Sequence, residues 1–236
     1  ISFGGLCSAT NPLGTASGIY ALFVAKFNST GQCEWISIAY NEQGYDIPIS
    51  EDFPARMSSI SLDSNSNIYI SSNCECGGNY NLIFGNISID PYSGTNSGAS
   101  ILAKLDKNGE WIWAIPLGEL EGPNNIEIDS NGNIWASYNY QLRKFNSSGS
   151  LQFTKNYGSI TDIYDLASDS FGNMYVVGGW GSGNSGELGQ STAYKDLFVH
   201  KLDSNGNQIW LSSEGQSTSS AYATSISIDV YDNIYV

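Results

Sequence analysis

Charged residues are scarce in this chain, and positively charged ones most of all. Of its 236 residues, 9 are Lys or Arg and 23 are Asp or Glu, which gives a net charge of −14. Nucleic acids and anionic membrane surfaces attract proteins through Lys and Arg, so this composition argues against both as partners. Because charged residues make up only 14% of the chain, the surface must be mostly neutral and polar, as in secreted or cell-surface proteins.

Long apolar runs, helical periodicity and a leader sequence are absent as well. No run of about 18 apolar residues occurs, so no transmembrane helix is expected. The lack of a 3.6-residue hydrophobic period favours an all-β fold. There is no starting Met and no signal-peptide pattern, so residue 1 is expected to be a mature end or a cut within a longer protein.

Residues and motifs that would mark an enzyme are few. The single histidine, His200, lies in the strand-like run LFVHKL, where a structural role is favoured over a catalytic one. No G-x-S-x-G motif and no phosphate-binding loop is present. Acidic pairs such as Glu119 and Glu121 have the chemistry for glycoside hydrolysis, but nothing marks any pair out. We therefore predict no catalytic residue and no cofactor, and an enzymatic activity is the least supported function.

Two sets of turns organise what is present. The first set consists of four turns that begin with Asp. Each of these turns follows one short apolar run and opens another, as hairpin turns do. The second set, NSTG, DKNG, NSSG and DSNG, follows runs that end in KF or KL. Four strands per period, joined by hairpins, predict the blades of a β-propeller. The first set reads DSNSNIY at Asp63–Tyr69, DSNGNIW at Asp129–Trp135, DSFGNMY at Asp169–Tyr175 and DVYDNIY at Asp229–Tyr235.

The fullest copy of the pattern is ASDSFGNMYVVGG followed by DLFVHKLDSNGNQIW, which ends at Trp210. It resembles the SBBP-type β-propeller repeat of bacteria and archaea, and LFVAKF and ILAKLDKNGEW match this repeat too. The resemblance covers nearly the whole chain and implies a propeller fold, but the family is defined by its scaffold and implies no function. The chain departs from the family in its count of four blades, and in Phe153, which stands where the other blades carry Trp.

We predict a single four-bladed β-propeller domain over residues 1–236, with four antiparallel strands in each blade. Three blades are expected at about 58–117, 124–158 and 160–215. The fourth blade is expected to combine 223–236 with 1–40, because the joined ends read IYVISFGG and so parallel MYVVGGWG within the third blade. A blade completed by both terminal segments would hide the edge strands of the ring.

Inside the predicted ring, the first strand of each blade lines the axis. Small residues stand there in three blades, and Glu127 takes the same place in the second. An unpaired buried carboxylate is costly, so Glu127 is expected to be paired or solvated rather than functional. Large aromatic residues on the fourth strands are expected to pack between blade edges. The small residues are Ser61, Ala167 and Ser227, and the aromatic residues are Trp35, Trp111 and Trp210.

The four cysteines, Cys7, Cys33, Cys74 and Cys76, are candidates for disulfides. Their spacing fits zinc poorly, and oxidised cysteines suit an extracellular protein. Cys33 is expected on the opposite face of the ring from the other three, which lie in the long loops expected over 4–18 and 74–100. A strand of about seven residues separates the faces by roughly 20 Å, whereas a disulfide needs Cα atoms within about 7 Å. We therefore predict that Cys33 bridges no cysteine of its own ring, and either meets one from a second ring or stays free.

Other candidate sites lie on turns and loops. Asn28, Asn86 and Asn146 begin N-glycosylation sequons, although an Asx turn alone would explain Asn28 and Asn146. The aspartate turns resemble the start of a calcium loop but lack its downstream Glu, so no metal site is predicted. A face rich in long loops, which includes Tyr80, Tyr92 and Trp180, is a candidate ligand surface.

These features favour a non-enzymatic extracellular structural protein whose rings stack head to tail into a filament or surface array. Disulfides between subunits or exchange of terminal strands would hold the copies together. The alternative is a secreted binding module, similar to an adhesin or a lectin, that holds a glycan or a surface protein on its loop-rich face.

Overall fold

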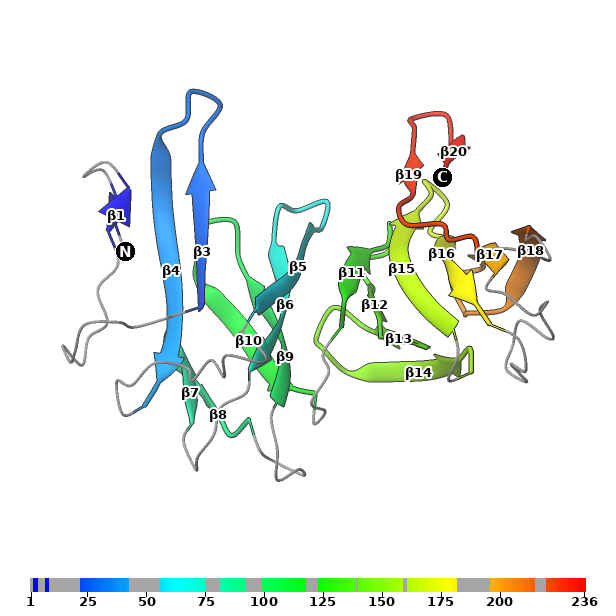
Figure 1. Cartoon of the computed structure of the whole chain (residues 1–236). Helices are drawn as coiled ribbons and strands as arrows, with labels where there is room; N and C mark the ends of the chain where they lie inside the picture. The colour runs from blue at the N-terminus through cyan, green and yellow to red at the C-terminus, as the bar shows by residue number, and fades with distance from the viewer. Residues whose placement is uncertain are drawn as a thin grey trace. The chain divides into compact units, whose positions relative to one another are not determined.

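All regular structure in the described part of the chain is β-strand. The computed structural model describes residues 2–3, 7–8, 22–42, 56–74, 81–91, 99–117, 123–138, 140–158, 161–181, 196–214 and 220–236. Among these residues there is no helix, and hence none with the length and apolar character to cross a membrane. The chain divides into two compact units, 1–60 with 65–122 and 61–64 with 123–236 (Figure 1).

The first unit contains two four-stranded sheets and one two-stranded sheet. The first sheet has the order β3-β4-β7-β8, the second sheet has the order β10-β9-β6-β5, and β1 pairs with β2. Their strands are β1 (Ser2–Phe3), β2 (Cys7–Ser8), β3 (Leu22–Phe27), β4 (Cys33–Asn41), β5 (Arg56–Leu62), β6 (Ile68–Cys74), β7 (Leu82–Phe84), β8 (Ile87–Ile89), β9 (Ala99–Leu105) and β10 (Trp111–Pro116).

The second unit contains two further four-stranded sheets and a hairpin. The third sheet runs β11-β12-β13-β14 and the fourth sheet β15-β16-β17-β18, each in chain order, while β19 and β20 form a two-stranded C-terminal hairpin. Their strands are β11 (Asn125–Ile128), β12 (Ile134–Ser137), β13 (Gln141–Phe145), β14 (Leu151–Asn156), β15 (Thr161–Ser168), β16 (Met174–Trp180), β17 (Asp196–Leu202), β18 (Gln208–Glu214), β19 (Ser227–Ile228) and β20 (Ile234–Tyr235).

The second, third and fourth sheets lie where the turn pattern predicts four strands each. In every one, the aspartate turn joins the first strand to the second, and successive strands of the third and fourth sheets pair antiparallel. The predicted fourth blade is not among the pairings of the described strands: β3 pairs with β4, and β19 pairs with β20. A blade shared by the two terminal segments therefore remains a prediction.

The prediction of a long loop over 74–100 is wrong in its middle. Residues 82–89 form the β7–β8 hairpin, which extends the first sheet by pairing Ala39 with Phe84 and Tyr40 with Ile83. Leu82 and Phe84 are fully buried, whereas the intervening Ile83 is only partly buried. The side chains of this short strand therefore point alternately into the core and towards the surface. Gly85 supplies the positive φ of 60° that the tight turn requires.

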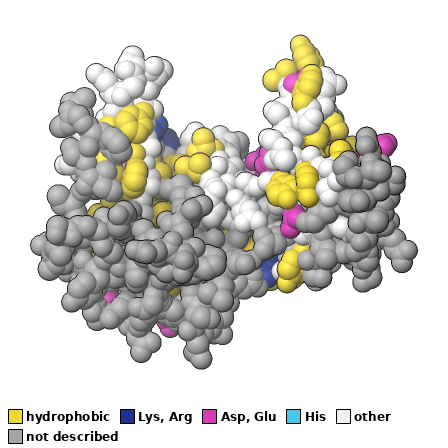
Figure 2. All heavy atoms as spheres, in the orientation of Figure 1, with side chains coloured by type: hydrophobic (Ala, Val, Ile, Leu, Met, Phe, Trp, Pro, Cys, Tyr) yellow, Lys and Arg dark blue, Asp and Glu magenta, His cyan; other side chains and the backbone are white. Residues whose placement is uncertain are grey.

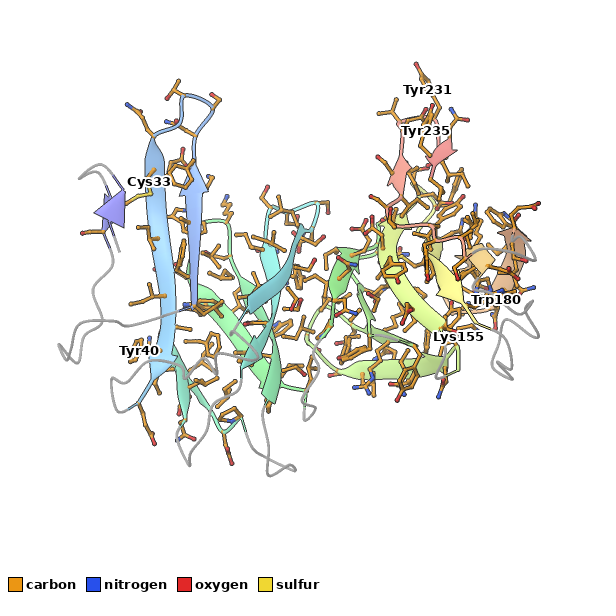
Figure 3. The ribbon with its side chains drawn as sticks, in the orientation of Figure 1. Cys33, Tyr40, Lys155, Trp180, Tyr231 and Tyr235 are labelled. Atoms are coloured by element: carbon orange, nitrogen blue, oxygen red, sulfur yellow. A yellow bond between two sulfur atoms is a disulfide. The ribbon has the colours of Figure 1, made fainter. Side chains whose placement is uncertain are left out.

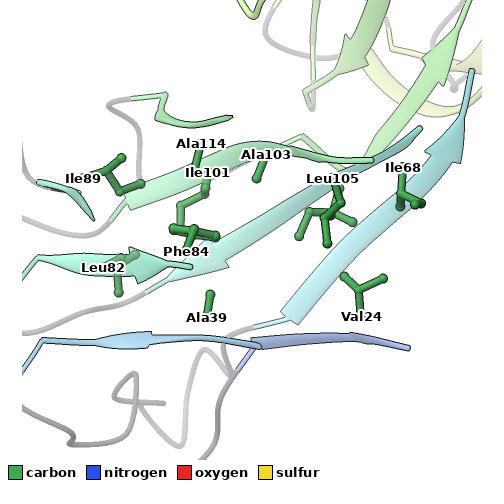
Figure 4. Packing of buried hydrophobic residues seen from close by; sticks show 11 residues of the cluster. Val24, Ala39, Ile68, Leu82, Phe84, Ile89, Ile101, Ala103, Leu105 and Ala114 are labelled. Carbon is green, nitrogen blue, oxygen red and sulfur yellow. The ribbon is translucent and has the colours of Figure 1, made fainter. Parts of the chain in front are cut away.

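Each unit has its own core. In the first unit, Phe84 and Leu82 of β7 pack with Leu105 of β9 and Ala39 of β4, all fully buried between the first and second sheets (Figure 4). In the second unit, one cluster around Trp135 joins the third and fourth sheets, and another joins the fourth sheet to the segment that leads into the C-terminal hairpin. Interdigitated apolar faces of neighbouring sheets thus account for the order of the sheets within each unit.

Candidate functional site

The aspartate turn of the third sheet shows why Asp begins each copy of the motif. Oδ1 of Asp129 accepts hydrogen bonds from the backbone N–H groups of Asn131 and Asn133, at 3.0 and 2.9 Å. Oδ2 accepts from Nε1 of Trp135 at 3.0 Å. Burial alone would raise the pKa of Asp129, but these bonds and the charge of Lys144 outweigh it and hold the pKa below its usual range. The carboxylate is satisfied by its own turn, as an Asx turn predicts.

A lysine from the third strand completes this arrangement. Lys144 stands opposite Trp135 in the β12–β13 register, and its Nζ lies 3.4 Å from Oδ2 of Asp129 and 4.7 Å from the centre of the Trp135 ring. The lysine side chain is 8% exposed and the aspartate side chain is not exposed at all. We call this set of an Asp, an aromatic residue and a Lys the triad.

The fourth sheet repeats the triad with Asp169, Tyr175 and Lys201. Nζ of Lys201 lies 2.9 Å from Oδ2 of Asp169 and 2.6 Å from the Tyr175 hydroxyl. Burial would lower the pKa of Lys201, but the hydrogen bonds to Tyr175 and Asp169 outweigh it and raise the pKa. Burial would raise the pKa of Asp169. The hydrogen bonds from Asn173 and Lys201 outweigh burial and lower this pKa. In both sheets the triad connects the third strand to the aspartate turn between the first and second strands.

The C-terminal hairpin carries two members of a triad. Asp229 accepts from the backbone N–H groups of Tyr231 and Asn233 at 2.9 Å each, and Tyr235 donates its hydroxyl proton to Asp229 at 3.2 Å. Bonds from Asn233 lower the pKa of Asp229, and the bond to Asp229 raises the pKa of Tyr235. Among the described residues no lysine forms an ion pair with Asp229.

The hairpin is also much more exposed than its counterparts. Tyr235 is 61% exposed, whereas Trp135 is fully buried and Tyr175 is 3% exposed. Tyr231 and Tyr235 lie on the hairpin in Figure 3, and hydrophobic side chains gather over the hairpin in Figure 2. The exposed apolar residues there include Val230 at 90%, Tyr231 at 82% and Val236 at 60%.

Strand β3 carries a lysine, Lys26, at the position that the triad lysines take in the third and fourth sheets. Lys26 precedes the same register irregularity that Lys144 and Lys201 precede, so the three lysines are equivalent. Its Nζ lies 2.7 Å from Glu34, in a pair whose side chains are 50% and 40% exposed. The next residue, Phe27, is 46% exposed, although the residues in its position on the second, third and fourth sheets, Leu105, Phe145 and Leu202, are at most 3% exposed.

The turns between third and fourth strands form a second set of contacts. An aromatic residue of the neighbouring sheet covers the turn glycine: the Trp35 ring lies against Gly109, and the Phe153 ring lies against Gly206. A Cβ at Gly109 would meet Trp35 at 2.7 Å, and one at Gly206 would meet the Phe153 ring. Around Gly31, in the turn that follows Lys26, no described residue has an atom within 4 Å of the Cβ position.

Glu127 is held by hydrogen bonds from Ser168 and, among the described residues, forms no ion pair, so the expected pairing with a charge or solvation stays a prediction. Its Oε1 accepts from Oγ of Ser168 at 2.9 Å and from the Ser168 backbone N–H at 3.3 Å. Burial raises the pKa of Glu127 against these two bonds, and the nearby charges of Asp165 and Asp129 raise it further. The contact joins the first strands of the third and fourth sheets.

The predicted isolation of Cys33 is wrong, because Cys33 and Cys7 form a disulfide with a Cα–Cα distance of 5.9 Å. The expected separation of the two cysteines required Cys7 to lie in a loop on the far face. Instead β2 lies beside β4, at whose first residue Cys33 stands (Figure 3). Cys74 ends β6, and Cys76 lies outside the described residues.

The candidate ligand face does not come together around Trp180. This residue is 4% exposed, packs in the core of the second unit, and places its Nε1 3.4 Å from Oδ2 of Asp196. It therefore offers no exposed ring to a ligand. Tyr80 and Tyr92 lie outside the described residues. His200 is fully buried with its Nδ1 3.0 Å from the Tyr157 hydroxyl, a position that suits a structural residue.

The three sequon asparagines lie on turns. Asn28 and Asn146 each accept hydrogen bonds from two backbone N–H groups of their own turns, which are the Asx turns expected for them. Asn86 is exposed at the tip of the β7–β8 hairpin. Whether any of them carries a glycan stays a prediction.

The large aromatic residues of the fourth strands divide into two groups. Trp35 and Trp111 lie between the first and second sheets, as predicted: Trp35 covers Gly109, and Nε1 of Trp111 donates to the Ile38 carbonyl at 3.2 Å. Trp210 instead packs edge-on against Tyr175 of its own sheet, with ring centres 5.8 Å apart.

Comparison with known proteins gives only distant likenesses. No family model matches the chain and no curated protein matches its sequence, so the resemblance to the SBBP-type repeat stays a prediction. Among solved structures, a streptogramin B lyase aligns at 11% identity with a TM-score of 0.42, over 75% of this chain and 46% of its own. A eukaryotic initiation factor aligns at 10% identity with a TM-score of 0.42, over 81% of this chain and 42% of its own.

The extracellular domain of a one-component system from B. thetaiotaomicron aligns at 15% identity with a TM-score of 0.37, over 99% of this chain and 32% of its own. This chain thus spans less than half the length of each of these three proteins.

Proposed function

We propose that this chain is a non-enzymatic extracellular structural protein, a four-bladed propeller subunit whose copies join head to tail through open strand edges into a filament or surface array. Each of the second, third and fourth sheets would be a blade. The β3–β4 pair and the C-terminal hairpin would be the two halves of a fourth. The Cys7–Cys33 disulfide supports an extracellular setting, since disulfides persist where the environment is oxidising.

The observation that carries the proposal is the exposure of the C-terminal hairpin. Tyr235 is 61% exposed at a position that is at most 3% exposed in the second, third and fourth sheets, where Tyr69, Trp135 and Tyr175 occupy it. In those sheets a third strand pairs with the strand that carries this residue. Exposed apolar side chains beside an unpaired strand edge are typical of a surface that another strand covers.

The joint would be made by strand pairing and not by a disulfide through Cys33. That cysteine is already bonded to Cys7, so the inter-subunit bridge that the sequence favoured has lost its basis. A strand added to an open edge gains main-chain hydrogen bonds and buries alternate side chains. Because the two edges that would meet are different surfaces, the contact is heterologous and repeats from copy to copy.

The proposal is tested by sedimentation velocity of the 236-residue chain over a wide concentration range, together with electron microscopy of the same samples. We expect species larger than one chain that grow with concentration, and linear particles in the micrographs. Tyr235→Lys should abolish them. Phe171→Lys, which removes a 77% exposed aromatic residue from the turn of the fourth sheet, is the matched control and should assemble normally. A single-chain species at all concentrations would overturn the proposal.

A further inference from the structure

We infer that the joint between copies is one shared blade, in which β20 of one copy pairs with β3 of the next copy and Tyr235 stands opposite Lys26. This inference rests on the proposed function and specifies its contact. The occupant of the hairpin edge is therefore a second copy of this chain, which presents the β3–β4 pair and the turn between them.

The register follows from the complete sheets. The aromatic residue of each triad stands opposite the lysine: Trp135 opposite Lys144, and Tyr175 opposite Lys201. The second sheet has the same pairing between Tyr69 and Lys104, with Ile70 opposite Ala103 one step further along. Applied to the two half blades, this register sets Ile234 opposite Phe27, Tyr235 opposite Lys26 and Val236 opposite Ala25.

Charge complementarity selects the β3 strand as the partner. Within the part of the chain that the structure describes, no lysine pairs with Asp229 or Tyr235 of the hairpin, whereas β3 presents Lys26 beside an exposed glutamate, Glu34. In the complete triad of the fourth sheet, Lys201 contacts both the aspartate and the tyrosine hydroxyl. Pairing in the inferred register would bring Lys26 to the same two groups, in a site that excludes more water than its present exposed pair with Glu34.

A second, independent contact points to the same partner. Trp35 covers the Gly109 turn, and Ser37 from the same strand donates a hydrogen bond to the Gly109 carbonyl. In the fourth sheet, Trp210 and Ser212 hold the positions that Trp35 and Ser37 hold in the first sheet. In each sheet the Trp stands opposite the lysine of the neighbouring strand, and the Ser stands opposite a valine two residues before that lysine.

The turn that Trp210 and Ser212 would cover is the one at Gly31, whose Cβ position has no atom of a described residue within 4 Å. The C-terminal hairpin belongs beside the fourth sheet, because the segment that leads into it shares a core cluster with Val177 and Val199. A β3–β4 pair that joins the hairpin edge therefore also brings its Gly31 turn towards the outer strand of the fourth sheet.

Disulfide trapping tests the register. Ala25→Cys in one chain and Val236→Cys in another place a cysteine pair at directly opposed positions, and we expect a covalent heterodimer when the two variants are mixed and oxidised. Phe23→Cys mixed with Val236→Cys is the out-of-register control. It lies two residues along β3, roughly 7 Å away, and should not cross-link.

The outcomes separate the register from the assembly itself. If the copies assemble but Val236→Cys cross-links with Phe23→Cys and not with Ala25→Cys, or with neither, the inferred register is overturned while the proposed function stands. If the double variant Ala25→Cys/Val236→Cys closes within single chains at high dilution, the second copy is the wrong occupant. If nothing assembles, both the function and the inference fail.

Charge substitutions test the shared triad. Asp229→Asn should weaken the association of copies roughly tenfold, because it removes a charge-assisted bond to Lys26. The turn should survive, since Asn28 and Asn146 accept the same backbone bonds in their own turns. Glu34→Gln frees Lys26 from its present partner and should strengthen association. An unchanged affinity in both variants would contradict the triad contact.

Discussion

Lysines at equivalent positions of the chain sit in very different surroundings. The Lys201 side chain is 17% exposed and lies 2.9 Å from a carboxylate that is fully buried, whereas the Lys26 side chain is 50% exposed and pairs with Glu34 near the surface. Removing one member of a buried ion pair leaves the other without compensation, but an exposed pair contributes little. Replacing each lysine by Met should therefore change the free energy of unfolding by different amounts.

We predict that Lys201→Met lowers the free energy of unfolding by about 3 kcal/mol, because Asp169 then keeps its buried charge without a cation. Lys26→Met, the control, should change it by less than about 1 kcal/mol. Urea denaturation followed by tryptophan fluorescence at neutral pH measures both. Equal effects of the two substitutions would mean that the ion pair in the fourth sheet does not stabilise it.

Glu127 provides a test in which the effect of a substitution on stability depends on pH. Burial raises the pKa of this carboxyl in the folded protein, so its contribution to stability is fully present below the unfolded pKa and is lost as the pH rises through the folded pKa. A glutamine side chain in its place would keep an oxygen to accept the bonds from Ser168 but would carry no charge. We predict that Glu127→Gln unfolds at higher urea concentration than the wild type at pH 7, and at the same concentration at pH 3.

The opposite result for Glu127→Gln, with destabilisation at pH 7, would mean that the ionised carboxylate is stabilised in the folded state. Asp169→Asn is a useful comparison because its direction is reversed. The pKa of Asp169 is lowered by bonds from Asn173 and Lys201, so its contribution is present above the unfolded pKa and is lost in acid.

At the scale of the elements, the turns between third and fourth strands join neighbouring sheets. Gly206 and Gly31 have almost the same φ, 83° and 80°, yet Phe153 covers only the first of them. An L-residue in this left-handed conformation costs about 1 kcal/mol wherever it stands. The ring that covers the turn adds a steric cost at Gly206 alone.

We therefore predict that Gly206→Ala lowers the free energy of unfolding by about 2 to 3 kcal/mol, because the new Cβ also displaces the Phe153 ring. Gly31→Ala should cost about 1 kcal/mol, measured below the concentration at which copies associate. Thermal denaturation under identical conditions compares the two. Equal losses would show that the packing of Phe153 on the turn contributes nothing.

The sequence predicts those features of the fold that neighbouring residues determine, and it does not predict contacts between segments that are far apart in the chain. The turn beginning at Asp129 is a local pattern, and it correctly places the strands on either side of it. The pairing of β7 with β4 was missed because the two segments are far apart in sequence, although the alternation in LIFGNISI and its Gly–Asn turn carry a hairpin signal. Cys7 was misplaced because β2 has two residues, too few to show any period.

The triad was not among the predictions from the sequence, for the same reason. The Asp, the aromatic residue and the Lys recur at fixed places in the repeat, yet their contact depends on the register between strands, which periodicity alone does not give. Phe153 stands out in sequence as the replacement of a Trp. Its role as the cover of Gly206 belongs to the packing of one sheet on the next, which no local pattern specifies.

At the scale of the whole molecule, the net charge of −14 opposes the approach of two copies. Salt screens this repulsion, since the Debye length is about 10 Å at 0.1 M ionic strength. The short-range pair between Lys26 and Asp229 that we infer would be desolvated in the joint and screened much less. Long-range charge therefore governs how fast copies meet, and the shared blade governs how long they stay together.

We predict that raising sodium chloride from about 20 mM to about 200 mM speeds the association of copies several-fold, because the repulsion between acidic surfaces is screened. Asp229→Asn should show the same acceleration but a faster dissociation at both salt concentrations, since the substitution alters the joint and hardly changes the total charge. Stopped-flow light scattering after a jump in protein concentration gives the association rate, and dilution gives the dissociation rate. An association rate that falls with salt would mean that opposite charges steer the copies together, contrary to the repulsion expected from the net charge.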